Sequence, residues 1–259
     1  MRTKRFRDLL DADGILVGLW ACDLENLADG PEHVTTVATL NIPLHGAFLR
    51  RGSGGQELVD PLTCSFSNVG DTWRSRHPAR CRDTGIYVTF APGRLTEPFE
   101  NSFRRLSPAR WLDWRVHAET LRALPQAAAV DATLLLVERE LATEATPPCI
   151  ELARDARARL GRRDARDVTT VAAELGVSPF VLCRSFRRAT GTTAHAWLDR
   201  MRAIRAADAI LAGATDLALL AVEVGFAHHS HLTARLRRVF GYTPTQLRAR
   251  VARTDLARM

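Results

Sequence analysis

Two segments near the C-terminal end of the sequence share one layout, which is a short helix, a tight glycine turn and a second helix. The first segment is VTTVAAELGVSPFVLCRSFRRATG. Ser178 is placed to cap its second helix, and Pro179 suits the first helical position. Leu182, Phe186 and Ala189 recur at i, i+4 and i+7, which predicts a face that packs on the short helix.

The second segment, DLALLAVEVGFAHHSHLTARLRRVFG, repeats the pattern. Leu232, Leu236 and Val239 form the expected buried stripe of its second helix. Such a pair of helices is the supersecondary unit of many DNA-binding domains, in which the second helix enters the major groove. Helical hairpins with glycine turns are common, so one copy is weak evidence and two copies are much stronger.

The segment between the two units, TTAHAWLDRMRAIRAADAILAG, predicts one helix of about 20 residues and therefore about 30 Å. One turn of B-DNA is about 34 Å, so this helix has the length to place two recognition helices in successive major grooves. Its expected packing stripe consists of Trp197, Met201, Ile204 and Leu211. Three arginines are then expected to be free for solvent or phosphate: Arg200, Arg202 and Arg205.

The positive charge is concentrated in the second half of the chain. Residues 151–259 contain 19 Arg against 10 Asp or Glu, whereas residues 1–150 contain 17 Lys or Arg against 19 acids. This asymmetry indicates an anionic partner for the second half, and nucleic acid is the commonest such partner. Charge alone fits a solvated arginine-rich surface equally well.

Residues 14–93 consist of short apolar or alternating runs separated by turn signals, which favours a β sandwich or small barrel. Helical periodicity begins near Ser107 and continues over SPARWLDWRVHAETLRAL and DATLLLVERELA. TEATPPC then reads as a linker. From Ile150 onward only helices are predicted, over residues 150–161, 167–175, 179–190, 193–212, 217–224, 228–239 and 244–252.

The five cysteines exclude two classes of small domain. Their number is odd and no two have C-x-x-C spacing, so neither a zinc finger nor a disulfide framework is indicated.

The apolar run from Gly14 to Cys22 is too short to span a bilayer and lacks a signal-peptide layout. We therefore expect a cytoplasmic protein with reduced thiols and no membrane partner.

The stretches LGVSPFVLCRSFRRATG, RMRAIRAADAIL and AVEVGFAHHSHLTARLRRVFGYTPTQLR resemble the DNA-binding domain of AraC/XylS transcription regulators over roughly residues 150–252. The resemblance implies seven helices and two recognition helices. It implies base contacts from Phe180, Cys183 and Arg184 in the first unit, and from His229, Ser230 and position 234 in the second. The family usually has Arg where this chain has Ala234 and Phe where it has Leu236, which puts base recognition by the second helix in doubt.

The set of DNA-binding residues proposed from the motif and the resemblance lies on the second helix of each unit. It comprises Phe180, Val181, Cys183, Arg184, Arg187, Arg188, His228, His229, Ser230, Thr233, Arg237 and Arg238.

The N-terminal half resembles the cupin-like ligand-binding domain of many such regulators, with NVGDTWRSRHP as the best stretch. The predicted fold class is therefore α+β with two domains: a small cupin-like β barrel with trailing helices, and an all-α domain of two helix-turn-helix units. The proposed boundaries are residues 1–143 for the sensory domain, 144–149 for the linker and 150–259 for the DNA-binding domain. The resemblance implies a small-molecule or stress signal and a possible homodimer.

The predicted function is a sequence-specific transcription regulator that binds double-stranded DNA and contacts RNA polymerase, and the sequence leaves open whether it is an activator or a repressor. No catalytic residue, metal or cofactor is predicted, and the ligand-binding residues are unknown. One alternative is a cupin-type enzyme fused to a nucleic-acid tether, although His45 and His77 lack the H-x-H and glutamate pattern of metal-binding cupins. The other is an architectural DNA binder without sequence preference, in which phosphate contacts alone give the affinity.

Several other residues leave a choice open. His228 and His231 share a helix face, but no carboxylate or cysteine is placed to complete a metal site. Trp111 and Trp114 fit either an interface or a core. Four aromatic residues fit either the core of the β domain or a ligand pocket: Trp20, Phe48, Phe66 and Trp73.

Overall fold

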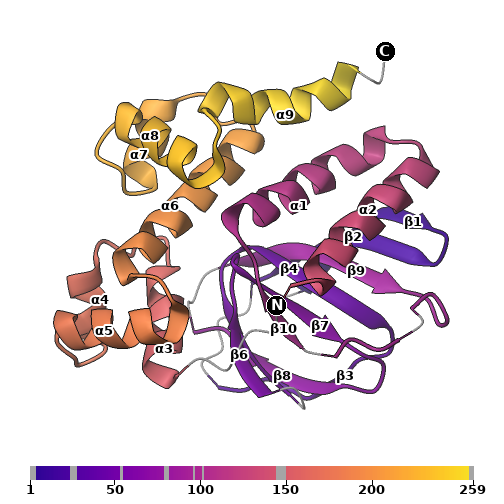
Figure 1. Cartoon of the computed structure of the whole chain (residues 1–259), viewed down its shortest axis with the longest axis horizontal. Coiled ribbons are helices and arrows are strands. Elements are labelled where there is room, and N and C mark those ends of the chain that lie inside the picture. The colour runs from indigo at the N-terminus through magenta and orange to yellow at the C-terminus, as the bar shows by residue number, and fades with distance from the viewer. Residues whose placement is uncertain are drawn as a thin grey trace. The chain divides into compact units, whose positions relative to one another are not determined.

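The computed structural model describes residues 4–23, 28–52, 55–78, 82–95, 97–100, 102–143 and 150–256. The chain divides into two compact units, one of residues 1–107 and 117–148 and one of residues 108–116 and 149–259 (Figure 1). The predicted fold class is confirmed, because the first unit is rich in antiparallel strands and the second is entirely helical. The proposed linker, residues 144–149, lies outside the described residues.

The first unit contains two antiparallel sheets. One has the strand order β1-β2-β9-β4-β7-β10 and the other β3-β8-β5-β6. The strands of the larger sheet are β1 (Lys4–Ala12), β2 (Ile15–Cys22), β4 (Ala38–His45), β7 (Thr63–Ser67), β9 (Asp83–Phe90) and β10 (Phe103–Arg105). Those of the smaller sheet are β3 (His33–Val34), β5 (Phe48–Gly52), β6 (Gly55–Val59) and β8 (Thr72–Arg76).

The hairpin of β1 and β2 shows how local sequence fixes the strand register. Asp13 and Gly14 both have positive φ angles, 49° and 73°, as the tight turns of two-residue hairpins require. The two strands then pair from Ala12 with Ile15 outward. Along β2, Ile15 and Val17 are completely buried, so this alternation supplies one wall of the β core.

Helices α1 (Pro108–Thr120) and α2 (Gln126–Leu141) follow the strands, joined by the short 3₁₀ helix η1 (Leu121–Ala123). The division between the two units falls inside α1, and residues 108–116 pack with the second unit. There Trp111 lies 6.1 Å from the ring of Phe240, and Asp113 forms an ion pair of 3.1 Å with Arg250. Trp111 and Trp114 are fully buried, which decides for the core between the two roles left open for them.

The second unit continues with seven helices within residues 150–256, and these follow the predicted ranges closely. They are α3 (Glu151–Leu160), α4 (Val168–Glu174), α5 (Pro179–Thr190), α6 (Ala194–Leu211), α7 (Leu217–Glu223), α8 (His229–Phe240) and α9 (Pro244–Leu256). Every helix of the described ranges is too short or too polar to cross a membrane.

The two helix-turn-helix units, α4–α5 and α7–α8, begin and end with the same devices. Asp167 caps α4 by accepting a hydrogen bond from the backbone N–H of Thr170 at 2.7 Å, and Asp216 caps α7 in the same way. Glycine takes the left-handed conformation in both turns, at Gly176 and Gly225. Helix α6 runs between the two helix-turn-helix units and has 18 residues, which is about 27 Å of helix (Figure 1).

Candidate DNA interface

The buried faces of α5 and α8 determine which side chains face outward. Leu182 and Phe186 of α5 are completely buried, and Phe186 packs edge-on against Trp197 of α6 with ring centroids 5.8 Å apart. Leu232 and Leu236 of α8 are completely buried as well. The first two members of each predicted stripe are therefore buried, whereas the third members, Ala189 and Val239, are half-buried. The opposite side of each helix is turned to solvent.

The structure places all twelve proposed DNA-binding residues at least partly in solvent. Phe180 is 73% exposed and Val181 is 44% exposed, although both are large apolar residues. Cys183 and Thr233 are half-buried, and the remaining ten are exposed: Phe180, Val181, Arg184, Arg187, Arg188, His228, His229, Ser230, Arg237 and Arg238. These two apolar side chains are neighbours in the first turn of α5 and lie on the same helix as Arg184, Arg187 and Arg188.

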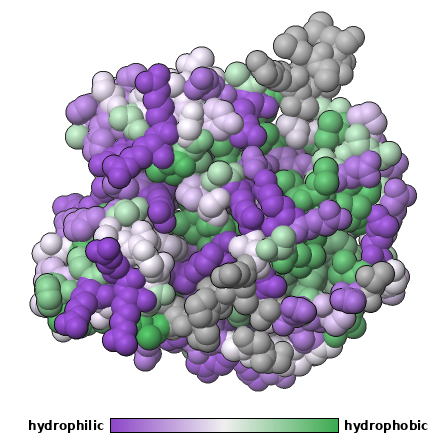
Figure 2. All heavy atoms as spheres, in the orientation of Figure 1, coloured by the Kyte–Doolittle hydropathy of each residue, from purple (hydrophilic) through white to green (hydrophobic). Residues whose placement is uncertain are grey.

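Most arginines of the second unit fall into two groups. Those on α5 and α8 named above, Arg184, Arg187, Arg188, Arg237 and Arg238, form no ion pair or hydrogen bond within the described part of the chain. Outside these groups, the side chains of Arg163, Arg166 and Arg200 also form no ion pair or hydrogen bond within the described residues, as expected for Arg200. Figure 2 shows hydrophilic side chains standing out over the surface of these helices.

The other group of arginines is occupied with internal contacts, and this corrects one expectation. Arg205 was expected to be free, but it is buried and donates to the carbonyl oxygen of Arg162 at 2.7 Å. Arg202 was also expected to be free, but it donates to the carbonyl oxygens of Ala165 and Arg166. Both therefore hold the loop between α3 and α4, whose carbonyls need donors when they are turned away from water.

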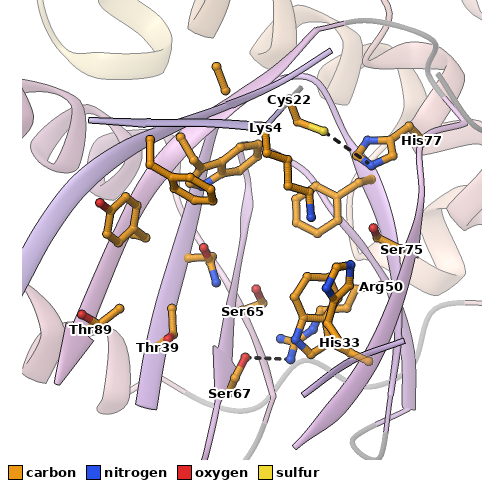
Figure 3. A pocket seen from close by; sticks show the side chains of 17 residues that line it. Lys4, Cys22, His33, Thr39, Arg50, Ser65, Ser67, Ser75, His77 and Thr89 are labelled. Atoms are coloured by element: carbon orange, nitrogen blue, oxygen red, sulfur yellow. Dashed lines mark hydrogen bonds between the residues drawn. The ribbon is translucent and has the colours of Figure 1, made fainter. Parts of the chain in front are cut away.

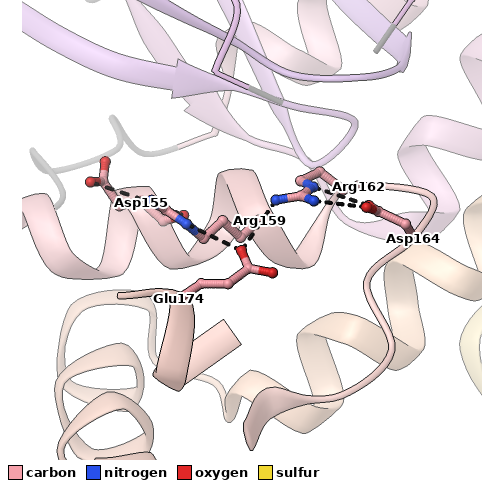
Figure 4. A network of polar contacts seen from close by, with 5 residues as sticks. All are labelled: Asp155, Arg159, Arg162, Asp164 and Glu174. Atoms are coloured by element: carbon pink, nitrogen blue, oxygen red, sulfur yellow. Dashed lines mark hydrogen bonds and ion pairs between the residues drawn. The ribbon is translucent and has the colours of Figure 1, made fainter. Parts of the chain in front are cut away.

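An ion-pair network holds α3 against the end of α4 (Figure 4). Glu174 accepts from Arg162 at 3.1 Å and lies 3.5 Å from Arg159. Arg162 also pairs with Asp164 at 2.7 Å, and its hydrogen bond lowers the pKa of that carboxyl group. Arg159 reaches Asp155 at 4.0 Å, an i, i+4 ion pair along α3. Much of the positive charge in this half is thus structural.

Helices α5 and α8 differ at several outward positions, and at one of them α5 has Arg184 where α8 has Ala234. Arg235 does not supply the missing guanidinium. It forms an ion pair of 3.1 Å with Asp199 of α6 and donates to the ring of His231. Arg237 remains exposed on α8.

The histidine cluster at the start of α8 has local roles. His228 is the N-cap, and its Nδ1 accepts a hydrogen bond of 3.2 Å from the backbone N–H of His231. His229 lies one turn before Thr233, with Nε2 and Oγ1 3.4 Å apart. Because the capping nitrogen of His228 is engaged by the backbone, the cluster orders the start of the helix.

The N-terminal unit contains a cavity of about 540 Å³ that residues of both sheets line (Figure 3). Three of the four aromatic residues singled out in the sequence, Trp20, Phe48 and Trp73, are on its wall. Phe66 is not, because it is buried against Phe99 with ring centroids 4.8 Å apart.

Two cations that were not predicted from the sequence face this cavity. Lys4 Nζ lies 5.4 Å and the Arg50 guanidinium 5.2 Å from the ring centroid of Trp73. Arg50 also donates to the hydroxyl of Ser67 at 2.7 Å, and burial lowers its pKa to about 10, so it stays charged at neutral pH. The lining residues, all of which are described, include no carboxylate. Phe48 and Arg50 are two positions apart on one strand, so the alternation that places Phe48 inward also places Arg50 inward. This spacing is the feature of the sequence from which Arg50 could have been predicted.

Comparison with known protein families supports a helix-turn-helix domain within the second unit. Residues 171–250 match the family model described as a helix-turn-helix domain. No curated protein matches the chain significantly.

Solved structures with similar parts include several bacterial regulators. The C-terminal domain of AraT, a response regulator from Geobacillus stearothermophilus, is 23% identical over 40% of this chain and 88% of its own, with a TM-score of 0.38. A DNA-binding transcriptional dual regulator from Escherichia coli K-12 is 24% identical over 43% of this chain and 99% of its own, with a TM-score of 0.37. ToxT from Vibrio cholerae O395 is 7% identical over 93% of this chain and 99% of its own, also with a TM-score of 0.37.

Proposed function

We propose that this chain, whose residues 171–250 form a helix-turn-helix domain of the AraC type, is a transcription regulator that binds specific DNA sites and responds to a small ligand. The observation that carries the proposal is that the arginines with internal partners and those without them lie on different helices. Those on α3, α6 and α9 are mostly held by internal partners, whereas those on the outward sides of α5 and α8 are not. Unpaired arginine forks on two exposed helices are suited to phosphate and guanine.

Within this proposal the outward residues of α5 divide by their place along the helix. Phe180, Cys183 and Arg184 lie in its first half and contact base edges, since the start of a recognition helix reaches deepest into the groove. Arg184 is the residue with the geometry for bidentate contact to guanine. Arg187 and Arg188, further along, bind phosphates and fix the register.

Helix α8 binds with a weaker sequence preference. His229, Ser230 and Thr233 are its base-contacting residues, and Arg237 and Arg238 bind phosphates. Because Ala234 replaces an arginine and Arg235 is paired with Asp199, this helix contributes mainly affinity.

The test is selection of bound sites from random duplex DNA with the full chain. A chain cut at residue 150 would lack Trp111 and Asp113, which pack with Phe240 and Arg250, so the full chain is the proper material. We expect one enriched motif with a strongly specified half-element and a weaker one about a helical turn away. Recovery of no enriched sequence, together with an affinity that falls with salt on every duplex, would establish a non-specific binder instead.

The ligand proposed for the N-terminal cavity has an aromatic or apolar body and an anionic group. Aromatic rings line the wall, Arg50 and Lys4 supply the charge, and no carboxylate on the wall neutralises them. Benzoate is expected to raise the melting temperature of the full chain more than its neutral analogue benzamide, and Arg50→Gln is expected to abolish the difference. Equal shifts in melting temperature with both compounds would show that Arg50 and Lys4 do not take part in ligand recognition.

RNA polymerase and a second copy of the chain remain proposed partners, and the cytoplasm remains the proposed location. We propose that the protein acts by binding, without an enzymatic step of its own.

A further inference from the structure

Three side chains form a chain of contacts at one end of the cavity, and the proposed regulator function uses none of them. They are Cys22 at the end of β2, His77 after β8 and Asp83 at the start of β9. The Sγ atom of Cys22 lies 3.9 Å from Nε2 of His77 (Figure 3). Nδ1 of His77 is hydrogen-bonded to Oδ2 of Asp83. Cys22 and Asp83 sit opposite each other in the β2–β9 pairing.

The backbone is shaped to hold the carboxylate of Asp83. Its Oδ1 accepts a hydrogen bond of 3.0 Å from the backbone N–H of Ala47. Gly46 has a φ of +76°, and a Cβ atom there would come within 1.9 Å of the same oxygen. Only glycine fits this approach. Asp83 is thereby fixed, and it fixes the tautomer and the orientation of the His77 ring.

The environment keeps the imidazole of His77 protonated. Burial opposes the charged form, but the hydrogen bonds with Asp83 and Cys22 outweigh it and raise the pKa to about 9. The imidazolium lies 3.9 Å from the sulfur of Cys22, where its positive charge stabilises the negative charge of an attacking sulfur. Cys64 offers a contrast, since burial raises its pKa and its thiol donates to the carbonyl of Arg104.

The cavity gives a small molecule a route to the sulfur. Cys22 and His77 both line it, and its volume of about 540 Å³ is in the range of small-molecule sites. Phe48 packs beside His77 and against Trp20, with ring centroids 6.0 Å and 5.8 Å apart. A molecule that reaches Cys22 therefore meets apolar rings, which favours an apolar body over a strongly hydrated one.

We propose that Cys22 is a covalent modification site at which the sulfur adds to a soft, apolar electrophile of the α,β-unsaturated carbonyl class, with His77 as the acid–base partner. Asp83 is the positioning residue, because it acts through the ring of His77.

The addition balances without an oxidant or a leaving group. In the reactive pair the imidazolium of His77 already holds the thiol proton, and a lone pair of the Cys22 sulfur forms the S–C bond at the β-carbon of the electrophile. The electron pair of the C=C bond moves to the α-carbon, which takes a proton from the imidazolium of His77. The net result is addition of S–H across the double bond.

The test measures alkylation of the full chain by N-ethylmaleimide, a small unsaturated carbonyl compound, with each cysteine followed separately by peptide mass spectrometry. At pH 7 we expect Cys22 to react at least tenfold faster than Cys64. Its rate is expected to change less than threefold from pH 8 to pH 6, whereas an unassisted thiol loses about tenfold per pH unit below a pKa of about 8.5. Half-buried Cys183 serves as the accessible comparison.

Two variants separate reactivity from structure. His77→Gln is expected to slow the reaction of Cys22 at least tenfold while leaving that of Cys183 unchanged, and Asp83→Asn is expected to slow it less. An unchanged rate at Cys22 in a folded His77→Gln chain would reduce the three residues to a structural contact and overturn the proposal. If that variant does not fold, the pH profile of the unmodified chain decides, and a tenfold loss per pH unit at Cys22 overturns the proposal equally.

This proposal does not rest on DNA binding. Failure of the site selection with rapid alkylation of Cys22 would refute the regulator function alone, and the reverse pair of results would refute the modification site alone.

Discussion

The two helix-turn-helix units of the C-terminal half have the same framework and different outward surfaces. In both, an aspartate caps the short helix, a glycine with positive φ makes the turn and a left-handed glycine, Gly191 or Gly241, ends the second helix. The outward positions are not repeated, since Arg184 in α5 corresponds to Ala234 in α8.

The comparison separates what the fold requires from what recognition requires. Caps, turns and buried stripes are dictated by backbone hydrogen bonds and by packing, so they recur. Outward side chains are unconstrained by the fold and differ between the units. The shared arginines, Arg187 and Arg188 in α5 and Arg237 and Arg238 in α8, suit the phosphate binding that we propose for both units.

The largest expected effect tests the shared framework. Phe186→Ala is expected to lower the free energy of unfolding by about 3–5 kcal/mol, because the side chain is completely buried against Trp197. Phe180→Ala, on the same helix but 73% exposed, is the matched control and is expected to change it by less than about 0.5 kcal/mol. Urea denaturation followed by circular dichroism measures both, and similar losses for the two variants would contradict the assignment of faces.

The next effect tests the difference between the units. Arg184→Ala is expected to reduce discrimination between the selected site and random DNA by about 1–3 kcal/mol, the contribution of one bidentate base contact. Arg187→Ala is the control, expected to weaken binding to both DNAs alike and to reduce the slope of affinity against salt by about one. Fluorescence anisotropy at several salt concentrations gives both quantities, and an Arg184→Ala chain with full discrimination would remove this residue from base recognition.

A gain of function sharpens the same comparison. Ala234→Arg gives α8 the outward guanidinium that α5 has, at a position that is exposed and therefore tolerant of a long side chain. We expect a new preferred base in the weaker half-element, by about 1 kcal/mol or more. Repeating the site selection with this variant is the measurement, and an unchanged motif would mean that α8 does not approach the bases.

The smallest expected effect concerns the caps. The hydrogen bond from the backbone of Thr170 lowers the pKa of Asp167 below 3.8 in the folded chain. Its cap therefore stabilises α4 fully above about pH 4, and this contribution is lost as the pH falls through the lowered value. Asp167→Asn keeps a capping side chain without the charge, so the acid-dependent part of the unfolding curve between pH 5 and pH 2 is expected to shrink. An identical pH dependence in the two chains would contradict this role of the carboxylate.

The sequence alone determined the helices, the turns and the repeated layout of the C-terminal half. Their signals are local: Ser178 before Pro179, glycine at each turn and apolar residues at helical spacing lie within a few positions of what they control. The exposure of the recognition residues followed from the same periodicity. For these features, the residues that carry the signal lie close in sequence to the helix or turn that they determine.

Only the tertiary structure decided which charged and reactive side chains have partners. Arg202 and Arg205 look free in the sequence, but they meet the carbonyls of a loop some forty residues away. Cys22 meets His77 across 55 positions, and Arg50 reaches a cavity whose other walls come from distant strands. Strand pairing and helix packing bring such groups together, and no short-range pattern encodes which strands and helices become neighbours.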